Sequence, residues 1–206
     1  MTFSGAAEQL VETSREFYRR GWVSGTSGNL SIVLDHHPAA VAITASSVDK
    51  GLITADQIVQ VGGDGRLLHG TGKPSAETLI HLAVIRTREA GAVLHTHSLY
   101  STTLSDIYGK DGRFFIEGYE MLKGLSGITT HEHREWIPIL ENSQDLQKLS
   151  GQAEDLLLRN PELHGFLIHR HGLYTWGKDL AEARRHIEIF EFLFEATVMS
   201  HSLRSG

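Results

Sequence analysis

The sequence predicts an α/β fold in which helices cover a mixed, largely antiparallel sheet. Short apolar runs typical of strands are separated by glycine-rich turns, which indicates that strands adjacent in sequence form hairpins. Between these runs lie segments whose apolar residues recur three and four positions apart, as in helices that pack on a sheet. With 206 residues, 40% of them hydrophobic, the chain suits one compact domain over residues 1–206.

The first third of the chain reads as a helix followed by strands. Helical spacing of apolar residues predicts a helix around residues 10–18, and Gly21 is a suitable stop for it. The turn-forming segment Gly62–Gly65 follows an apolar run and predicts a hairpin. Three strands are expected here, at residues 30–34, 41–44 and 58–61.

Helices and strands then alternate. Ser75 suits the N-cap of a helix over residues 79–86 that ends near Gly91, and a strand that carries His95 follows. Pro138 indicates that a short strand over residues 137–140 lies at a sheet edge, because proline cannot donate to a neighbouring strand. The remaining pattern predicts a helix, two paired strands and a final helix, over residues 145–158, 166–168, 173–176 and 180–201.

Composition excludes several classes of function. The net charge of −6 and the pI near 6.1 argue against a nucleic-acid-binding protein, so an anionic substrate would have to be met by a local pocket. The absence of cysteine excludes disulfides, thiolate catalysis and cysteine–zinc sites. The first residues lack the features of a signal peptide, and no apolar stretch approaches the ~20 residues that span a bilayer. We therefore expect a cytoplasmic protein without a membrane partner.

The pair His95-Thr96-His97, directly after the apolar run Ala92-Val93-Leu94, is the clearest chemical signal. Side chains alternate along a strand, so the two imidazoles point to the same face and can reach one metal ion. The same spacing recurs at His169-Arg170-His171, but periodicity does not choose between these two histidines, and Gly172 could introduce a bulge there. A third such pair, His131 and His133, has charged neighbours and no preceding strand, and we interpret it as surface.

Small and polar residues cluster at the ends of the predicted strands. Glycine lets backbone N–H groups approach an anion, and asparagine, serine and lysine add donors and charge. Each loop by itself reads as an ordinary turn, and together they form a phosphate cradle only if the fold unites them. The candidates for contact with an anionic substrate are Gly28, Asn29, Ser46, Ser47, Lys50 and Ser75.

Two carboxylates remain as candidates for catalysis. Glu77 lies in the first turn of the predicted helix, where an acidic residue commonly has a structural role. Glu120 lies in a loop bracketed by glycines, and loops carry functional residues disproportionately often. Glu120 is therefore the stronger candidate for proton transfer.

Four motifs, in order, resemble the class II aldolase/adducin family: Gly28-Asn29-Leu30-Ser31, Lys73-Pro74-Ser75-Ala76-Glu77, His95-Thr96-His97-Ser98 and His171-Gly172. The resemblance covers about residues 8–200. It implies a three-layer α/β/α domain, one Zn²⁺ per subunit held by His95, His97 and His171, and a homotetramer with active sites near subunit contacts. It also implies Glu120 as the catalytic acid/base, a sugar-phosphate substrate, and Glu77 as a second carboxylate that orients substrate hydroxyls or a water.

Within the family, Glu120–Gly124 and Arg170–Gly177 resemble the zinc lyases that dehydrate a sugar phosphate. The segment Ala45-Ser46-Ser47 departs from the Pro-Ser-Gly common at this place in the family, which leaves the individual phosphate donors open. Two alternatives remain. One is an aldolase or epimerase that acts on another sugar phosphate, such as fuculose or ribulose phosphate. The other is a non-catalytic module like the adducin head, which would be expected to lack the three histidines.

Overall fold

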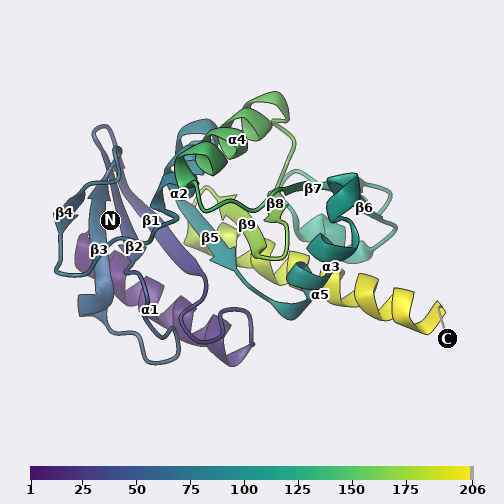
Figure 1. Ribbon diagram of the computed structural model, residues 1–206, viewed down its shortest axis with the longest axis horizontal. Coiled ribbons are helices and arrows are strands. Elements are labelled where there is room, and N and C mark those ends of the chain that lie inside the picture. The colour runs from purple at the N-terminus through teal and green to yellow at the C-terminus, as the bar shows by residue number, and fades with distance from the viewer. Residues whose placement is uncertain (205–206) are drawn as a thin grey trace.

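The computed structural model describes residues 1–204, which form one nine-stranded sheet with helices on both faces (Figure 1). The strands are β1 (Asn29–His36), β2 (Ala39–Thr44), β3 (Ile58–Gly62), β4 (Leu67–His69), β5 (Ala92–Thr96), β6 (Arg113–Glu117), β7 (Arg134–Leu140), β8 (Gly165–Ile168) and β9 (Gly172–Gly177). Their order across the sheet is β4-β3-β2-β1-β5-β9-β8-β7-β6. All neighbours are antiparallel except β7 and β8, so the predicted mixed, largely antiparallel sheet is confirmed.

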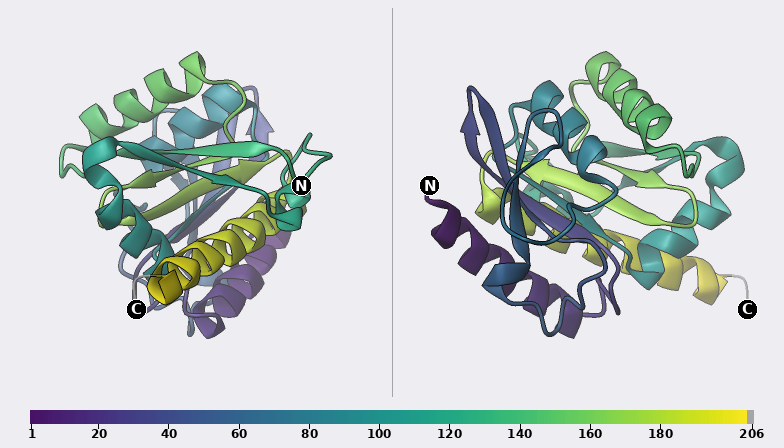
Figure 2. Two further views of the ribbon diagram at one scale, coloured as in Figure 1. Left: turned by 90° about the vertical axis from the view of Figure 1, so that its right-hand side faces the viewer. Right: turned by 60° about the vertical axis from the view of Figure 1, so that its left-hand side comes forward.

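The helices complete the three layers. They are α1 (Phe3–Arg19), α2 (Thr78–Arg88), α3 (Leu99–Ile107), α4 (Leu146–Arg159) and α5 (Leu180–Arg204), with short 3-10 turns η1 (Ala55–Gln57), η2 (Gly109–Asp111) and η3 (Glu120–Gly124). Figure 2 shows α1 and α5 on one face of the sheet and α2 and α4 on the other. Ion pairs of Glu16 with Arg184 and of Arg20 with Glu188 join α1 to α5.

Strand β5 lies near the middle of the sheet and is buried along its whole length. Its neighbours are β1 and β9, so His95 has Asn29 on one side and Tyr174 on the other. Burial on both faces explains the apolar run that precedes the two histidines. The central position of β5 places them where the end of β5 meets the starts of β1 and β9 and the loops that precede these two strands.

Local chemistry explains most element boundaries. Gly21 has a positive φ of 75° just after α1 and ends that helix as predicted. Ser75 is not the N-cap of α2, because Glu77 takes that position. The Ser75 hydroxyl instead accepts the Glu77 N–H at 3.3 Å, and its carbonyl accepts the Thr78 N–H, so Ser75 stabilises the turn before the helix.

The predicted edge position of Pro138 is wrong, because β7 lies between β8 and β6, and β6 is the edge strand. The proline is tolerated because β8 pairs only with Ile139 and Leu140, so Pro138 lies just outside that ladder. The sequence interpretation also missed β6 and α3. No helix of the described residues is long and apolar enough to cross a membrane.

Candidate metal and substrate site

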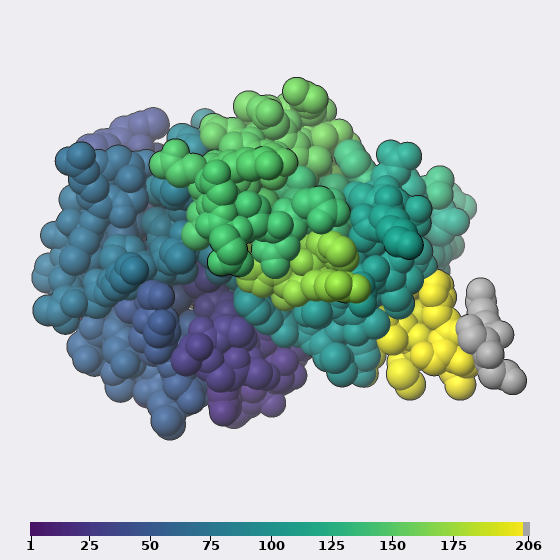
Figure 3. Space-filling model, viewed as in Figure 1, coloured from purple at the N-terminus to yellow at the C-terminus, as the bar shows by residue number. Residues whose placement is uncertain are grey.

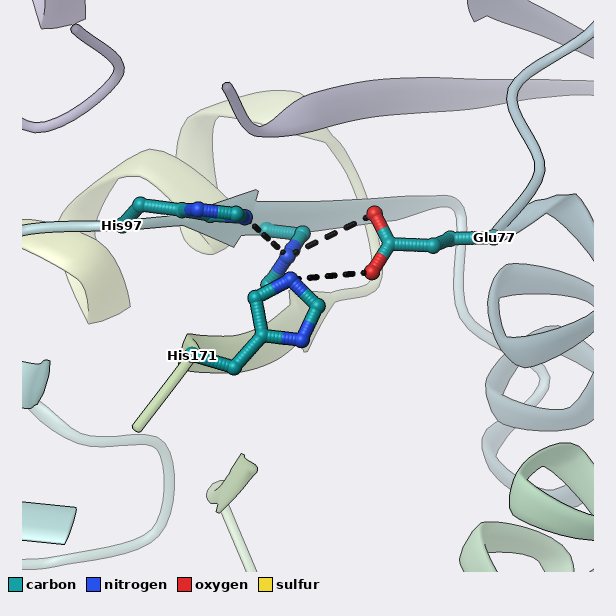
Figure 4. A group of neighbouring side chains, drawn as sticks. Glu77, His97 and His171 are labelled. Atoms are coloured by element: carbon teal, nitrogen blue, oxygen red, sulfur yellow. Dashed lines mark hydrogen bonds and ion pairs between the residues drawn. The ribbon is translucent and has the colours of Figure 1, made fainter. Parts of the chain in front are cut away.

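Three imidazoles and one carboxylate converge at the ends of β5 and β9. One possible ligand atom from each of His95, His97, His171 and Glu77 lies within 4.8 Å of the corresponding atoms of the others. Nε2 of His95 is 2.7 Å from Nε2 of His97, which directly follows the last residue of β5, so the alternation of side chains continues past the end of the strand. Nε2 of His171 is 3.2 Å from Oε1 of Glu77, and Figure 4 shows the three labelled side chains pointing toward one another.

The chain turns sharply between β8 and β9, and this turn separates His169 from His171. Arg170 has a φ of 52°, so the segment is a hairpin loop rather than a regular strand, and the two histidines do not share a face. The ring of His169 lies 3.7 Å from Asp106 and 3.5 Å from Glu141, while His171 joins the cluster. The choice that the sequence left open therefore falls on His171.

Glycine lets the strands approach closely enough to form the cluster. A Cβ at Gly172 would lie 2.0 Å from the carbonyl oxygen of Thr96, so only glycine lets β9 begin against the end of β5. Gly28 has a φ of 69°, and a Cβ there would lie 2.7 Å from the carbonyl oxygen of His95. These two contacts bring His171 and the Gly28 turn beside the histidine pair.

The protonation states of the cluster suit a metal. Burial, above all, lowers the pKa of His95 far below its usual value and that of His97 to about 2, so both rings are neutral. Nδ1 of His95 donates to the carbonyl of Leu173 at 2.9 Å, which leaves the lone pair on Nε2 facing the cluster. Oε1 of Glu77 is buried without a hydrogen-bond partner. Three imidazole nitrogens and a carboxylate are ligands that Zn²⁺ accepts, so these residues fit a metal ion.

Tyr174 supports the buried ring of His95 from β9. The two rings are stacked with centroids 3.9 Å apart, and Phe166 stacks on the other face of the tyrosine at 5.1 Å. Such packing restricts the ring of His95 to one orientation. Sequence analysis did not single out Tyr174.

A cavity of about 290 Å³ opens beside the cluster. All residues that the sequence marked as substrate contacts line it together with His97 and His171: Gly28, Asn29, Ser46, Ser47, Lys50, Ser75 and Glu77. They come from three separate loops and from the start of α2. The fold therefore unites what the sequence shows as unrelated turns.

Lys50 is the cation of this cavity. Its side chain is only 1% exposed, and Nζ donates to the carbonyls of Val48 at 3.0 Å and Thr26 at 3.4 Å. Burial lowers the pKa of Lys50 to about 8, although Asp49 and Glu77 favour its charged form. The ammonium group is thus largely charged at neutral pH in a site that an anion could share.

The sequence interpretation missed part of the cavity wall. The missed residues are Asn142, Ser143 and Gln144 in the loop between β7 and α4, and Leu146 at the start of α4. In Figure 3 the green part of the chain, to which this loop and α4 belong, lies on the face toward the viewer. The polar residues between β7 and α4 could have marked this loop as a candidate for the site. The sequence did not indicate, however, which loops of the molecule would face one another.

Glu120 lies away from this cavity. It begins η3, its side chain is 69% exposed, and it pairs with Lys123 and, at 3.7 Å, with His131. The hydrogen bond and the charge of Lys123, above all, lower the pKa of its carboxyl group. Glu120 is absent from the lining of the cavity, so the described chain does not bring it together with the histidine cluster.

The other histidine pair lies outside the cluster. His131 is exposed, whereas Nε2 of His133 bonds to the buried carboxylate of Glu135 at 2.7 Å. His164 bonds to the same carboxylate at 3.0 Å. Among the described residues, only His95, His97, His171 and Glu77 form a group that could hold a metal.

Comparisons with known proteins agree with this geometry. Residues 8–198 match the family model described as "Class II Aldolase and Adducin N-terminal domain". The chain is 47% identical over 189 residues to the methylthioribulose-1-phosphate dehydratase of Stenotrophomonas maltophilia strain K279a, a match that covers 91% of this chain and 87% of the relative. It is 41% identical to the protein of the same name from Sorangium cellulosum strain So ce56, covering 98% and 95%.

Solved structures share the fold. YgbL from Klebsiella pneumoniae superposes with a TM-score of 0.81 at 26% identity, covering 97% of this chain and 91% of that one. The L-fuculose-1-phosphate aldolase from Thermus thermophilus superposes with a TM-score of 0.77 at 20% identity, covering 98% and 99%. The motifs, the fold and the matched family model agree over nearly the whole chain, and the protein therefore belongs to the class II aldolase and adducin family.

Proposed function

We propose that the protein is a hydro-lyase that converts 5-methylthioribulose 1-phosphate into 5-methylthio-2,3-dioxopentyl phosphate, a step of methionine salvage. The observation that carries this proposal is the histidine–carboxylate cluster beside a cavity that a buried lysine and several hydroxyls also line. Relatives up to 47% identical carry the name of this activity. We further propose that residues 1–206 act as one catalytic domain.

The metal is proposed to be Zn²⁺, one per subunit, held by His95, His97 and His171, with Glu77 beside it. Zinc accepts imidazole nitrogen, and three protein ligands leave room for substrate oxygens. When bound, the ion supplies Lewis acidity that polarises the substrate carbonyl and stabilises the negative charge that develops after proton loss.

The phosphate is proposed to bind in the same cavity, at the residues that line it from the loops. Lys50 supplies charge, the turn at Gly28 allows a close backbone approach, and the serines supply hydroxyl donors: Ser46, Ser47 and Ser75. Asn29 lines the same cavity, but both ends of its amide group already bond to protein groups, Glu77 and His81. Its predicted contact with phosphate competes with these bonds.

Glu120 is proposed as the acid/base. It would take the proton from C3 of the substrate and return it to the C4 hydroxyl, which leaves as water; the resulting enol then tautomerises to the diketone. Because Glu120 is exposed and lies outside the cavity of its own chain, we propose that it enters the cavity of a neighbouring copy in a homotetramer. Exposed apolar side chains nearby, Phe115 and Met121, suit such a contact. A cytoplasmic location remains a prediction from sequence.

Turnover of 5-methylthioribulose 1-phosphate before and after chelation tests the reaction. We expect loss of diketone formation on chelation, recovery on addition of Zn²⁺, and loss of both metal and activity in His97→Ala. Release of a triose phosphate fragment would instead indicate an aldolase, and inversion of a hydroxyl an epimerase. Full activity in metal-free protein would contradict the proposal.

Subunit complementation tests the role of Glu120. We expect Glu120→Gln to bind zinc normally and to lose turnover by about two to four orders of magnitude, the usual contribution of a general acid–base group. When inactive Glu120→Gln and inactive His97→Ala chains are unfolded and refolded together, mixed oligomers should regain activity, because some sites combine an intact metal cluster with an intact Glu120. If the mixture stays inactive although mixed oligomers form, Glu120 does not act across a subunit contact.

A further inference from the structure

His81 is a buried histidine one helical turn after Glu77, and neither the motifs nor the proposed reaction assign it a role. It lies on α2, its side chain is fully buried, and both of its ring nitrogens have partners. Nδ1 is 2.7 Å from the hydroxyl of Ser31, and Nε2 contacts Oδ1 of Asn29. A buried imidazole satisfied at both ends has one fixed orientation.

The partners determine the direction of each hydrogen bond. Nδ2 of Asn29 donates to Oε2 of Glu77 at 2.5 Å, because an ionised carboxylate only accepts. The amide oxygen of Asn29 therefore faces His81, and Nε2 of His81 must donate to it. Burial keeps this ring neutral by lowering its pKa to about 4, so Nδ1 accepts from the hydroxyl of Ser31. Every donor in this series points toward Glu77.

The series ends at the metal cluster. Oε2 of Glu77, which accepts from Asn29, is 3.6 Å from Nε2 of His95, and Oε1 is 3.2 Å from Nε2 of His171. Asn29 pairs directly with His95 across β1 and β5, so the amide and the imidazole keep a fixed spacing. The orientation of the carboxylate thus depends on Asn29, and the orientation of Asn29 depends on His81.

We infer that His81 is a positioning residue: through Asn29 it fixes the orientation of the Glu77 carboxylate at the histidine cluster. Partners of this kind behind a metal ligand typically change metal affinity 10–100-fold when they are removed. The inference rests on the proposal that the cluster binds a metal, but not on the identity of the substrate. Asn29 and Ser31, which lie in β1, thereby have a role in supporting the cluster.

The affinity of the metal-free protein for Zn²⁺, measured by competition with a chromophoric chelator, tests this inference. We expect His81→Leu, which has a similar volume but no hydrogen bonds, to bind zinc 10–100-fold more weakly. His81→Gln, whose amide can still donate to Asn29, should recover most of the affinity. Val84→Ala, a buried change on the same helix, controls for loss of packing and should bind as the unaltered protein does.

A double variant tests whether His81 acts through Asn29. If it does, His81→Leu combined with Asn29→Ala should bind zinc no more weakly than the weaker of the two single variants, because both remove the same support. Additive losses, or unchanged affinity in His81→Leu, would overturn the inference. If the unaltered protein itself bound no Zn²⁺, the proposed function would fail instead, so the two failures are distinguishable.

The unaltered protein offers a test that needs no variant to fold. The ¹⁵N chemical shifts of the ring of His81 distinguish its two neutral tautomers. We expect the proton on Nε2, as required for donation to Asn29, in the metal-free and the zinc-loaded protein alike. A proton on Nδ1 with a bare Nε2 would overturn the inference whatever the affinities show.

Discussion

At the scale of single residues, the spacing of His95 and His97 was enough to predict that their rings converge. In an extended chain, side chains two residues apart point to the same face. Glu77 was harder to interpret. An acidic residue at the start of a helix is common for electrostatic reasons, and only its distances of 3.2 and 3.6 Å to two imidazoles show that it belongs to the cluster.

Lys50 provides a prediction about substrate binding. We expect Lys50→Met to raise the KM for a phosphorylated substrate about ten- to a hundredfold, the size of one hydrogen bond to a charged group. Steady-state kinetics with matched zinc loading measure this change. Lys73→Met is the control, because Lys73 is an exposed lysine outside the lining of the cavity and should leave KM nearly unchanged.

The same residue predicts a pH dependence. The pKa of Lys50 is lowered to about 8, so its charge is present below that pH and is lost as pH rises through it. We therefore expect kcat/KM to fall above about pH 8, because this ratio reports ionisation of the free enzyme. The fall should be absent in Lys50→Met, and an identical fall in that variant would assign it to another group.

At the scale of elements, the long helices and most strands were predicted, but two short elements were not. The helices α1 and α4 carry clear apolar stripes, and α5 was predicted from its recurring apolar residues. Strand β6 and helix α3 are short and lie at the periphery, where fewer positions must be apolar, so their patterns are weak. The paired strands at residues 166–168 and 173–176 were predicted and are confirmed, but the conformation of the turn between them was not predicted, because Arg170 adopts a positive φ without being glycine.

Two glycines should respond oppositely to alanine. Gly172→Ala places a Cβ against the carbonyl of Thr96, so we expect a loss of about 1–3 kcal/mol in the free energy of unfolding and weaker zinc binding. Gly151→Ala lies in α4 in open space and should stabilise the protein by about 0.5–1 kcal/mol with normal zinc binding. Denaturant unfolding measures both changes. If both substitutions change the free energy of unfolding equally, the close approach of β9 to β5 does not require glycine at position 172.

At the scale of the whole molecule, buried histidines link stability to pH. Burial lowers the pKa values of His81 and His186 to about 4, whereas in the unfolded chain both titrate near 6.5. Between these values the unfolded state binds more protons, so stability is full above pH 6.5 and falls as pH decreases toward 4. Each residue contributes up to about 3 kcal/mol to this fall.

Unfolding of the metal-free protein by denaturant at several pH values measures this effect. His186 is the residue to alter, because it bonds to the carbonyl of Trp176 and to Ser126, away from the metal cluster. His186→Gln should be less stable at neutral pH but should lose less stability between pH 6.5 and 4. If the free energy of unfolding of His186→Gln falls with pH as steeply as that of the unaltered protein, His186 does not contribute to the pH dependence.

The sequence by itself determined the fold class, the family and the histidine pair, because these depend on local periodicity and on motifs that each lie within a few residues of chain. Only the tertiary structure decided that Glu77 completes the cluster and that Glu120 stays outside the cavity of its own chain. Periodicity left His169 and His171 open, and the structure places His171, the ligand that the resemblance implied, in the cluster. These outcomes depend on contacts between segments distant in sequence. These contacts depend on the turn at Arg170, on the close approach of β9 to β5 that Gly172 permits, and on hydrogen bonds between α2 and β1. No local sequence pattern encodes them.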